Sequence, residues 1–129
     1  MNVPKDLFYT KEHEWARLSG KTAHVGITDH AQAALGDITF VGLPKKGEVL
    51  KKTGTSATVE SVKAASDVYA PFSGKVIATN DELSAHPELV NKSPYDKGYF
   101  FSMEISDESE KNGLMDAKAY ASYLEGIGK

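Results

Sequence analysis

The stretch Glu60-Ser61-Val62-Lys63-Ala64-Ala65-Ser66-Asp67, written ESVKAASD, places one lysine among small and β-branched residues and between two carboxylates. The preceding segment contains the β-branched Thr58 and Val59 and no helix-capping signal, and a strand-like pattern resumes at Val68. Such runs on either side of a short polar turn are typical of a hairpin. We therefore predict a strand, a tight turn and a second strand, with Lys63 at or beside an exposed hairpin tip.

A single helical turn is the alternative for the same residues. Glu60 and Lys63 stand at i and i+3, and Lys63 and Asp67 stand at i and i+4, which are the spacings of side-chain pairs on a helix. Local propensity does not decide between the two forms. In either form, an exposed lysine is most often a solvated surface charge. The functional alternative is acylation of its ε-amine by a modifying enzyme, which the small neighbours at 64–66 would leave accessible.

A strand, a helix and a second strand are predicted before this stretch. Apolar residues at 23, 25 and 27 alternate with polar or small neighbours, which predicts a half-buried strand. Thr28 and Asp29 offer an N-cap to a helix over 30–35, and Gly36 follows where a left-handed residue is favoured. Residues 38–43 carry apolar side chains on both faces, so we predict a central strand there.

The C-terminal part is predicted to contain a strand, a polar loop over 107–113 and a helix. Four large apolar residues share one face of the strand: Tyr99, Phe101, Met103 and Ile105. Asp116 can cap the helix, and Gly126 is predicted to end it. Its apolar positions recur at i, i+3, i+4 and i+7: Ala117, Tyr120, Ala121 and Leu124. We predict that this helix packs against the core; binding of a partner is the alternative.

A weak internal repeat relates two segments. Residues 43–50 and 70–77 share the pattern Pro-x-x-Gly-charged-Val-aliphatic, which reads as a turn that leads into a strand. Such patterns also recur by chance in β proteins. The alternative is a domain made of two related β halves, joined by the segment that contains Lys63.

The composition limits the classes of function. A chain of 129 residues is predicted to form one domain over residues 1–129 with a single core. The net charge of −3 and the scattered lysines argue against nucleic acid as a partner. The absence of cysteine excludes disulfides and thiolate chemistry by the chain itself, and the four histidines show no metal-binding spacing, so no metal is predicted. No long apolar run or targeting signal is found, so we expect a cytoplasmic protein without a membrane partner.

Six motifs occur in order along the chain: DLFYT at 6–10, HEW at 13–15, VGITDHAQ at 25–32, GDITFV at 36–41, VESVKAASD at 59–67, and NKSPY at 91–95 with Gly98 after it. With these motifs and the closing helix, the chain resembles the H-protein family of the glycine cleavage system, whose members carry lipoic acid on a lysine. The likeness covers nearly the whole chain.

This resemblance implies a mainly β fold, a lipoyl/biotinyl-type barrel-sandwich hybrid of two β halves with short helices and a C-terminal helix. It also implies covalent lipoic acid on Lys63, the lysine of the ESVK motif, and makes Glu60, Val62 and Ala64 candidates for recognition by the lipoylating enzyme. Biotin carriers instead place their lysine between methionines. Lipoyl domains of 2-oxoacid dehydrogenases commonly read D-K-A, so Val62 favours the H-protein family.

The resemblance further implies a carrier that is not itself an enzyme. The lipoyl group would accept an aminomethyl group from glycine decarboxylase (P protein), deliver it to an aminomethyltransferase (T protein) and be reoxidised by dihydrolipoamide dehydrogenase (L protein). In the family the loaded arm rests in a cleft. Glu14, from the HEW motif, and Asp67 are therefore candidate partners for the amine of the cargo, and a solvated carboxylate is the alternative for each.

Three positions depart from the family pattern: Glu12, Gly42 and Tyr99 stand where the family often has Ser, Glu and Trp. They leave the preference for particular partners open. One alternative function is an H-like relay that donates lipoyl groups to other enzymes. Another is a structural or interaction module in which Lys63 is never modified.

Overall fold

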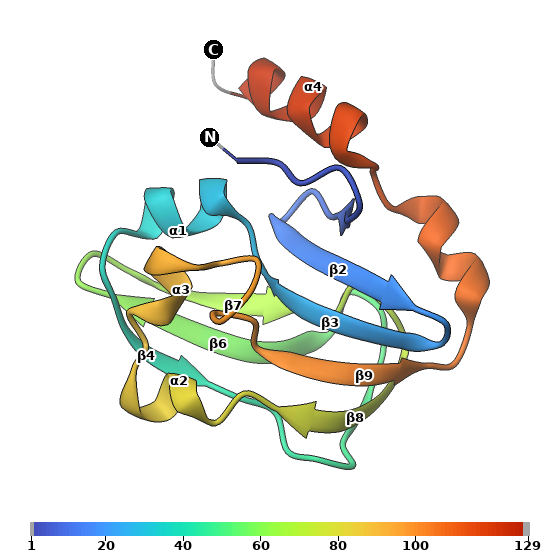
Figure 1. Cartoon of the computed structure of the whole chain (residues 1–129), viewed down its shortest axis with the longest axis horizontal. Coiled ribbons are helices and arrows are strands. Elements are labelled where there is room, and N and C mark those ends of the chain that lie inside the picture. Colours follow the sequence, from blue (N-terminus) through green and yellow to red (C-terminus); the bar gives the residue numbers. More distant parts are fainter. Residues whose placement is uncertain (1, 128–129) are drawn as a thin grey trace.

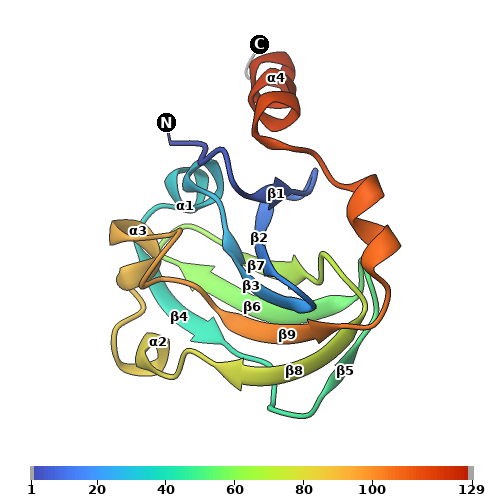
Figure 2. The same ribbon diagram turned by 45° about the vertical axis from the view of Figure 1, so that its right-hand side comes forward.

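The computed structural model describes residues 2–127 as two antiparallel sheets with helices at their margins (Figures 1 and 2). The strands are β1 (Phe8–Tyr9), β2 (Glu14–Ser19), β3 (Thr22–Ile27), β4 (Ile38–Gly42), β5 (Val49–Leu50), β6 (Thr55–Ser61), β7 (Ala65–Tyr69), β8 (Gly74–Thr79) and β9 (Phe101–Ile105). The helices are α1 (Asp29–Leu35), α2 (Glu82–Ala85), α3 (Leu89–Lys92), α4 (Ala117–Ile127) and the 3₁₀ helix η1 (Glu108–Gly113). Across residues 2–127, none of these helices has the length and apolar character needed to cross a membrane.

The main hydrophobic core lies between the two sheets. One sheet has the order β1-β2-β3-β9-β8-β5 and the other the order β4-β6-β7. Val25 and Met103 from the first sheet share the core with Val59 and Val68 from the second. Neither sheet closes on itself, as expected of a barrel-sandwich hybrid. The predicted fold class, mainly β with short helices and a C-terminal helix, is confirmed.

The two repeat segments lie next to each other. Strands β5 and β8 pair antiparallel, with Val49 opposite Lys75 and Leu50 opposite Gly74. Strand β5 follows a turn at 46–47, whereas β8 begins at Gly74 after a bend at 71–72, so the strand is confirmed in both copies and the turn only in the first.

Helix α1 forms where it was predicted. The hydroxyl of Thr28 accepts a hydrogen bond from the backbone N–H of Ala31 at 3.2 Å and caps the first turn. Gly36 follows the helix with a φ of 82°, a conformation that residues with a side chain rarely adopt. This turn directs the chain into β4, beside the hairpin that carries Lys63 (Figure 1).

The prediction of a central strand at 38–43 is wrong. Among residues 2–127, strand β4 pairs with β6 alone, so it is an edge strand of the three-stranded sheet. Its register shifts between Ile38 and Phe40, and this irregularity turns the Phe40 side chain outward, where it is 51% exposed. Apolar residues occur on both faces because the strand is a bulged edge strand: Ile38 and Val41 face the core, and Phe40 faces outward.

The C-terminal segment also differs from prediction in detail. Helix η1 replaces the predicted polar loop, because the Asp107 carboxylate accepts a hydrogen bond from the N–H of Ser109 at 3.0 Å and starts a 3₁₀ turn. Helix α4 continues through Gly126 to Ile127. Tyr99 precedes β9 and lies outside its regular face.

Helix α4 packs against the N-terminal strands, as predicted. Asp116 caps it, and the fully buried ring of Tyr120 stacks on Tyr9 with 4.5 Å between ring centroids. Ala121, predicted to face the core, is exposed, and Tyr123 contributes to the packing instead. The helix thus covers a second, smaller apolar cluster, so the expectation of a single core is wrong.

Candidate functional site

Lys63 lies in the turn of the β6–β7 hairpin, and its side chain is exposed. The hairpin prediction is confirmed, and the alternative of a helical turn is wrong. Ser61 shapes the turn: its N–H donates to the carbonyl of Ala64 at 2.8 Å, and its hydroxyl accepts from the N–H groups of Lys63 and Ala64, each at 3.1 Å. The backbone of Lys63 is therefore fixed locally, while its amine extends into solvent.

The neighbours of Lys63 leave the amine accessible. Glu60, Val62 and Ala64 are exposed around it, and Val62 exposes 68% of its surface. Within residues 2–127, no ion pair involves Lys63. These three neighbours lie where a modifying enzyme would have to approach, and their part in recognition stays a prediction.

The turn that contains Lys63, called the lysine turn below, contacts the loop between α1 and β4. The N–H of Val62 donates to the carbonyl of Asp37 at 3.1 Å. A methyl group added at Gly36 would lie 3.3 Å from Cε of Lys63, so the aliphatic stem of the lysine passes close to this glycine. The turn is thus supported from outside as well as by its own hydrogen bonds.

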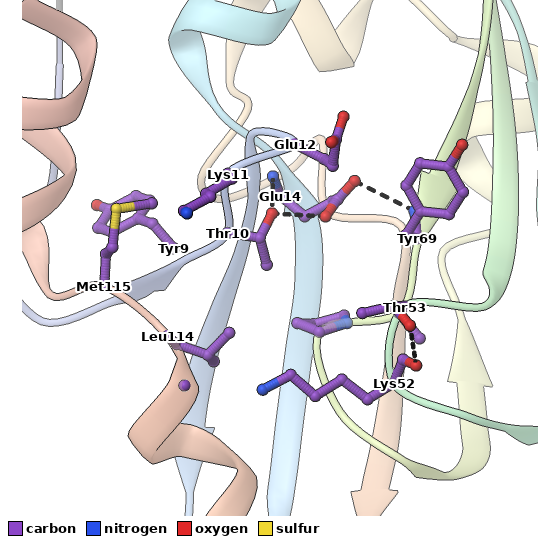
Figure 3. Close-up of a pocket in the computed structure, with 13 residues that line it drawn as sticks. Tyr9, Thr10, Lys11, Glu12, Glu14, Lys52, Thr53, Tyr69, Leu114 and Met115 are labelled. Carbon is purple, nitrogen blue, oxygen red and sulfur yellow. Dashed lines mark hydrogen bonds between the residues drawn. The ribbon is translucent and has the colours of Figure 1, made fainter. Parts of the chain in front are cut away.

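A pocket of about 430 Å³ lies at the other end of β7 (Figure 3). Four chain segments line it: the turn before β2, the turn before β6, the end of β7 and the connection from η1 to α4. Leu114 and Met115 form an apolar wall, and Glu14 contributes a carboxylate. The pocket therefore combines an apolar surface with one buried acidic group.

Glu14 is only 2% exposed, and its carboxylate accepts two hydrogen bonds. Oε1 accepts from the hydroxyl of Thr10 at 2.6 Å, and Oε2 accepts from the backbone N–H of Tyr69 at 3.1 Å (Figure 3). Burial raises the pKa of Glu14 to about 7, although both hydrogen bonds oppose this rise. Near neutral pH, the group is therefore balanced between its ionised and protonated forms.

An unusual turn positions Glu14. His13 has a φ of 70°, and its N–H donates to the carbonyl of Thr10 at 3.1 Å, while the N–H of Thr28 donates to the carbonyl of His13 at 2.9 Å. Thr53, which lines the opposite side of the pocket, has a φ of 72°. Positive φ values are uncommon outside glycine, and strained residues of this kind gather at functional sites. Both walls of the pocket therefore carry a backbone conformation that the rest of the fold must hold in place.

Helix α4 holds the same turn from outside. Nδ1 of His13 lies 2.8 Å from the hydroxyl of Tyr120, which is also 2.8 Å from the hydroxyl of Thr28. Burial, followed by the nearby His30, lowers the pKa of His13 below its usual 6.5. The C-terminal helix is thus connected to the segment that presents Glu14.

The structure does not bring Asp67 into the pocket. Asp67 is exposed on β7 opposite Thr58, whereas the contact with Glu14 is made by Tyr69, at the end of the strand. At about 3.3 Å per residue, β7 separates its Lys63 end from Tyr69 by roughly 13 Å. Lys63 and Glu14 are therefore associated with opposite ends of one strand.

Sequence reasoning missed Thr10 and Tyr69 as members of the site. Tyr69 contributes a backbone N–H, so no pattern of side chains could reveal it. The spacing of Thr10, four residues before Glu14, was the one available signal, and it is typical of a hydroxyl that closes a turn.

The residues described here offer no metal centre. Within residues 2–127, no group of three or more histidine or acidic side chains is arranged to hold a metal ion. The rings of His13 and His30 approach to 4.4 Å between centroids, but Nδ1 of His13 already contacts Tyr120.

Comparisons with known proteins agree with this geometry. The family described as Glycine cleavage H-protein matches residues 7–127. The glycine cleavage system H protein of Bradyrhizobium diazoefficiens is 55% identical over 115 residues, which cover 89% of this chain and 94% of that protein. That of Salmonella paratyphi C is 54% identical over 125 residues, which cover 96% and 97%. A crystal structure of a glycine cleavage system H protein from Mycobacterium marinum superposes with a TM-score of 0.84 at 32% identity and covers 98% of this chain and all of that one. With an exposed lysine on a fixed turn and a match along nearly its whole length, this chain belongs to the glycine cleavage H-protein family.

Proposed function

We propose that Lys63 carries a covalently attached lipoyl group, and that the chain uses it to carry an aminomethyl group from glycine decarboxylase to an aminomethyltransferase before dihydrolipoamide dehydrogenase reoxidises it. Membership in the family makes the chain a carrier component of the glycine cleavage system. The observation that supports the choice of residue is the exposed amine of Lys63 at the tip of a tight hairpin.

The residues around Lys63 fit such a group. The amine has no ion-pair partner within residues 2–127, so an acylating enzyme would not have to break one. An extended lipoyl-lysine side chain of about a dozen bonds spans on the order of 15 Å. That length exceeds the roughly 13 Å of β7 from Ala65 to Tyr69, although Lys63 itself lies two residues before Ala65. An extended arm on Lys63 would therefore cover most of the way along β7 towards the Glu14 pocket.

The chain supplies position, and the attached group supplies reactivity. When bound, the lipoyl group offers a disulfide that accepts the aminomethyl group and is thereby reduced, chemistry for which this cysteine-free chain has no side chain of its own. Lys63 provides the anchoring nitrogen and loses its charge when the amide forms. The fixed turn keeps the point of attachment constant, so that tethering raises the effective concentration of the cargo at each partner.

We assign Glu14 to the amine of the cargo. Each oxygen of its carboxylate accepts one hydrogen bond and keeps a further acceptor site. A positive ammonium group in the pocket would favour the ionised form of Glu14 and form a charge-assisted hydrogen bond that is shielded from water. For Asp67, only its place near the lysine turn supports such a role, because its side chain is exposed.

Two measurements test the carrier function. Incubation with a lipoylating enzyme and a lipoyl donor is expected to raise the intact mass by one lipoyl group, and peptide mapping is expected to locate that group on Lys63. The lipoylated chain is then expected to support glycine-dependent CO₂ exchange by a glycine decarboxylase. An unchanged mass would indicate an unmodified interaction module. Lipoylation without CO₂ exchange would indicate a relay of lipoyl groups.

Replacement of Glu14 by alanine tests the role of the pocket. We expect Glu14→Ala to shorten the lifetime of the isolated loaded carrier several-fold, because the amine loses its buried partner and water enters the pocket. Ammonia release from the loaded carrier measures this lifetime. Asp67→Ala serves as the comparison and is expected to keep the lifetime of the parent. Equal lifetimes for Glu14→Ala and the parent would contradict the assignment.

A further inference from the structure

The side-chain amide of Asn91 ties the α1–β4 loop to helix α3. Its Oδ1 accepts from the N–H of Ile38, and its Nδ2 donates to the carbonyl of Gly36 and to Oε1 of Gln32, each at 2.9 Å. These bonds engage the acceptor and both donors of the amide. Asn91 therefore fixes the loop on both sides of Asp37.

The same loop supports the lysine turn. The carbonyl of Asp37 accepts from the N–H of Val62 at 3.1 Å, and Ile38 pairs with Ser61 at the start of the β4–β6 ladder. The stem of Lys63 passes so close to Gly36 that a methyl group there would lie 3.3 Å from Cε. Figure 1 shows α1, α3 and the β6–β7 turn at the same end of the molecule. A continuous set of contacts thus leads from Asn91 to the stem of the lysine.

We propose that Asn91 is a positioning residue for the modification of Lys63: by holding the α1–β4 loop, it sets the direction in which the lysine stem leaves the turn. This inference rests on the proposed function, because it concerns the reaction that attaches the lipoyl group. Ser61 fixes the backbone of the turn but does not limit the four-carbon stem beyond it. The loop at Gly36 limits that stem, which increases the fraction of conformers that present the amine to an activated acyl group.

Asn91→Asp is the sharpest test, because aspartate has nearly the same shape. It keeps an acceptor for the N–H of Ile38 but places an oxygen against the oxygens of Gly36 and Gln32. We expect kcat for enzymatic lipoylation to fall roughly tenfold, with a smaller change in KM, since misalignment of the amine affects the bound complex. We also expect faster hydrogen exchange at the N–H of Val62. Asn112→Asp, at an exposed position in η1, makes the same change of charge and is expected to match the parent.

Acylation of Lys63 by a small N-hydroxysuccinimide ester separates positioning from loss of structure. The proposal requires this chemical rate to stay at the parent value in Asn91→Asp while the enzymatic rate falls. An equal fall in both rates, or an enzymatic rate equal to that of the parent, overturns it. If Asn91→Asp does not fold, Gln32→Met removes one of the three amide bonds, together with the bond from Gln32 to Asp29, and is judged by the same two rates. A parent chain that no lipoylating enzyme modifies would instead contradict the proposed function.

Discussion

Lys63→Arg is expected to abolish lipoylation and, with it, glycine-dependent CO₂ exchange, while the free energy of unfolding stays within about 0.5 kcal/mol of the parent value. Arginine keeps the positive charge and the length of the exposed side chain, but its guanidinium does not lose its proton in proteins and so offers no nucleophilic amine. No ion pair within residues 2–127 involves Lys63, so the substitution should change the free energy of unfolding little. Intact mass, CO₂ exchange and urea unfolding measure the three quantities.

Lys75→Arg provides the matched control for this variant. Lys75 is exposed, as Lys63 is. It lies on β8 in the six-stranded sheet, whereas the hairpin of Lys63 belongs to the three-stranded sheet. We expect Lys75→Arg to be lipoylated and to support CO₂ exchange as the parent does. Lipoylation of Lys63→Arg to the same extent as the parent would show that another lysine is the point of attachment, and the carrier function proposed for Lys63 would be wrong.

The hairpin could be predicted from the sequence because its signals are local. β-branched residues on either side of a short turn favour strands, and the hydrogen bonds of Ser61 that close the turn lie within four residues of the chain. Helix α1 could be predicted for the same reason, since its capping residues, Thr28 and Gly36, directly adjoin the ends of the helix. Strand β4 was misjudged because its neighbours in the sheet, and the bulge that exposes Phe40, depend on distant segments.

The pocket shows the limit of such reasoning more clearly. Glu14 was a candidate because of its motif, but its burial depends on segments that meet only in the folded chain, including the N–H of Tyr69, 55 residues away. The role of Asn91 has the same origin, since its partner Ile38 lies 53 residues away. A sequence pattern can name a polar residue, but the partners that determine its pKa or fix its side chain come from tertiary structure.

Glu14 should give the protein a pH-dependent stability that Glu14→Gln removes. In the folded chain the pKa of Glu14 is about 7, against an ordinary value near 4.5. Between these values the folded state binds more protons than the unfolded state, so the free energy of unfolding falls as pH rises. The contribution of Glu14 to the free energy of unfolding is fully present below pH 4.5 and is lost as pH rises through 7. The shift in its pKa corresponds to about 3 kcal/mol.

Glutamine at position 14 stays neutral and can keep both hydrogen bonds. Its carbonyl can accept from the N–H of Tyr69, and its amide can donate to the hydroxyl oxygen of Thr10. Urea unfolding from pH 4.5 to 8 is therefore expected to show the parent losing about 3 kcal/mol relative to Glu14→Gln. Glu125→Gln, at an exposed site on α4, is expected to follow the parent curve.

The comparison with Glu14→Gln isolates one group among several that titrate. Burial lowers the pKa values of His13 and His24 below 6.5, so these residues destabilise the fold as pH falls, which is the opposite direction to Glu14. Both histidines are present in the parent and in the variant, so the difference between the two curves removes their contribution. Parallel curves over this range would mean that Glu14 keeps an ordinary carboxyl pKa in the folded chain. A difference that grows with pH would mean that the folded chain favours the protonated acid at position 14, which a bound ammonium group would convert to its carboxylate.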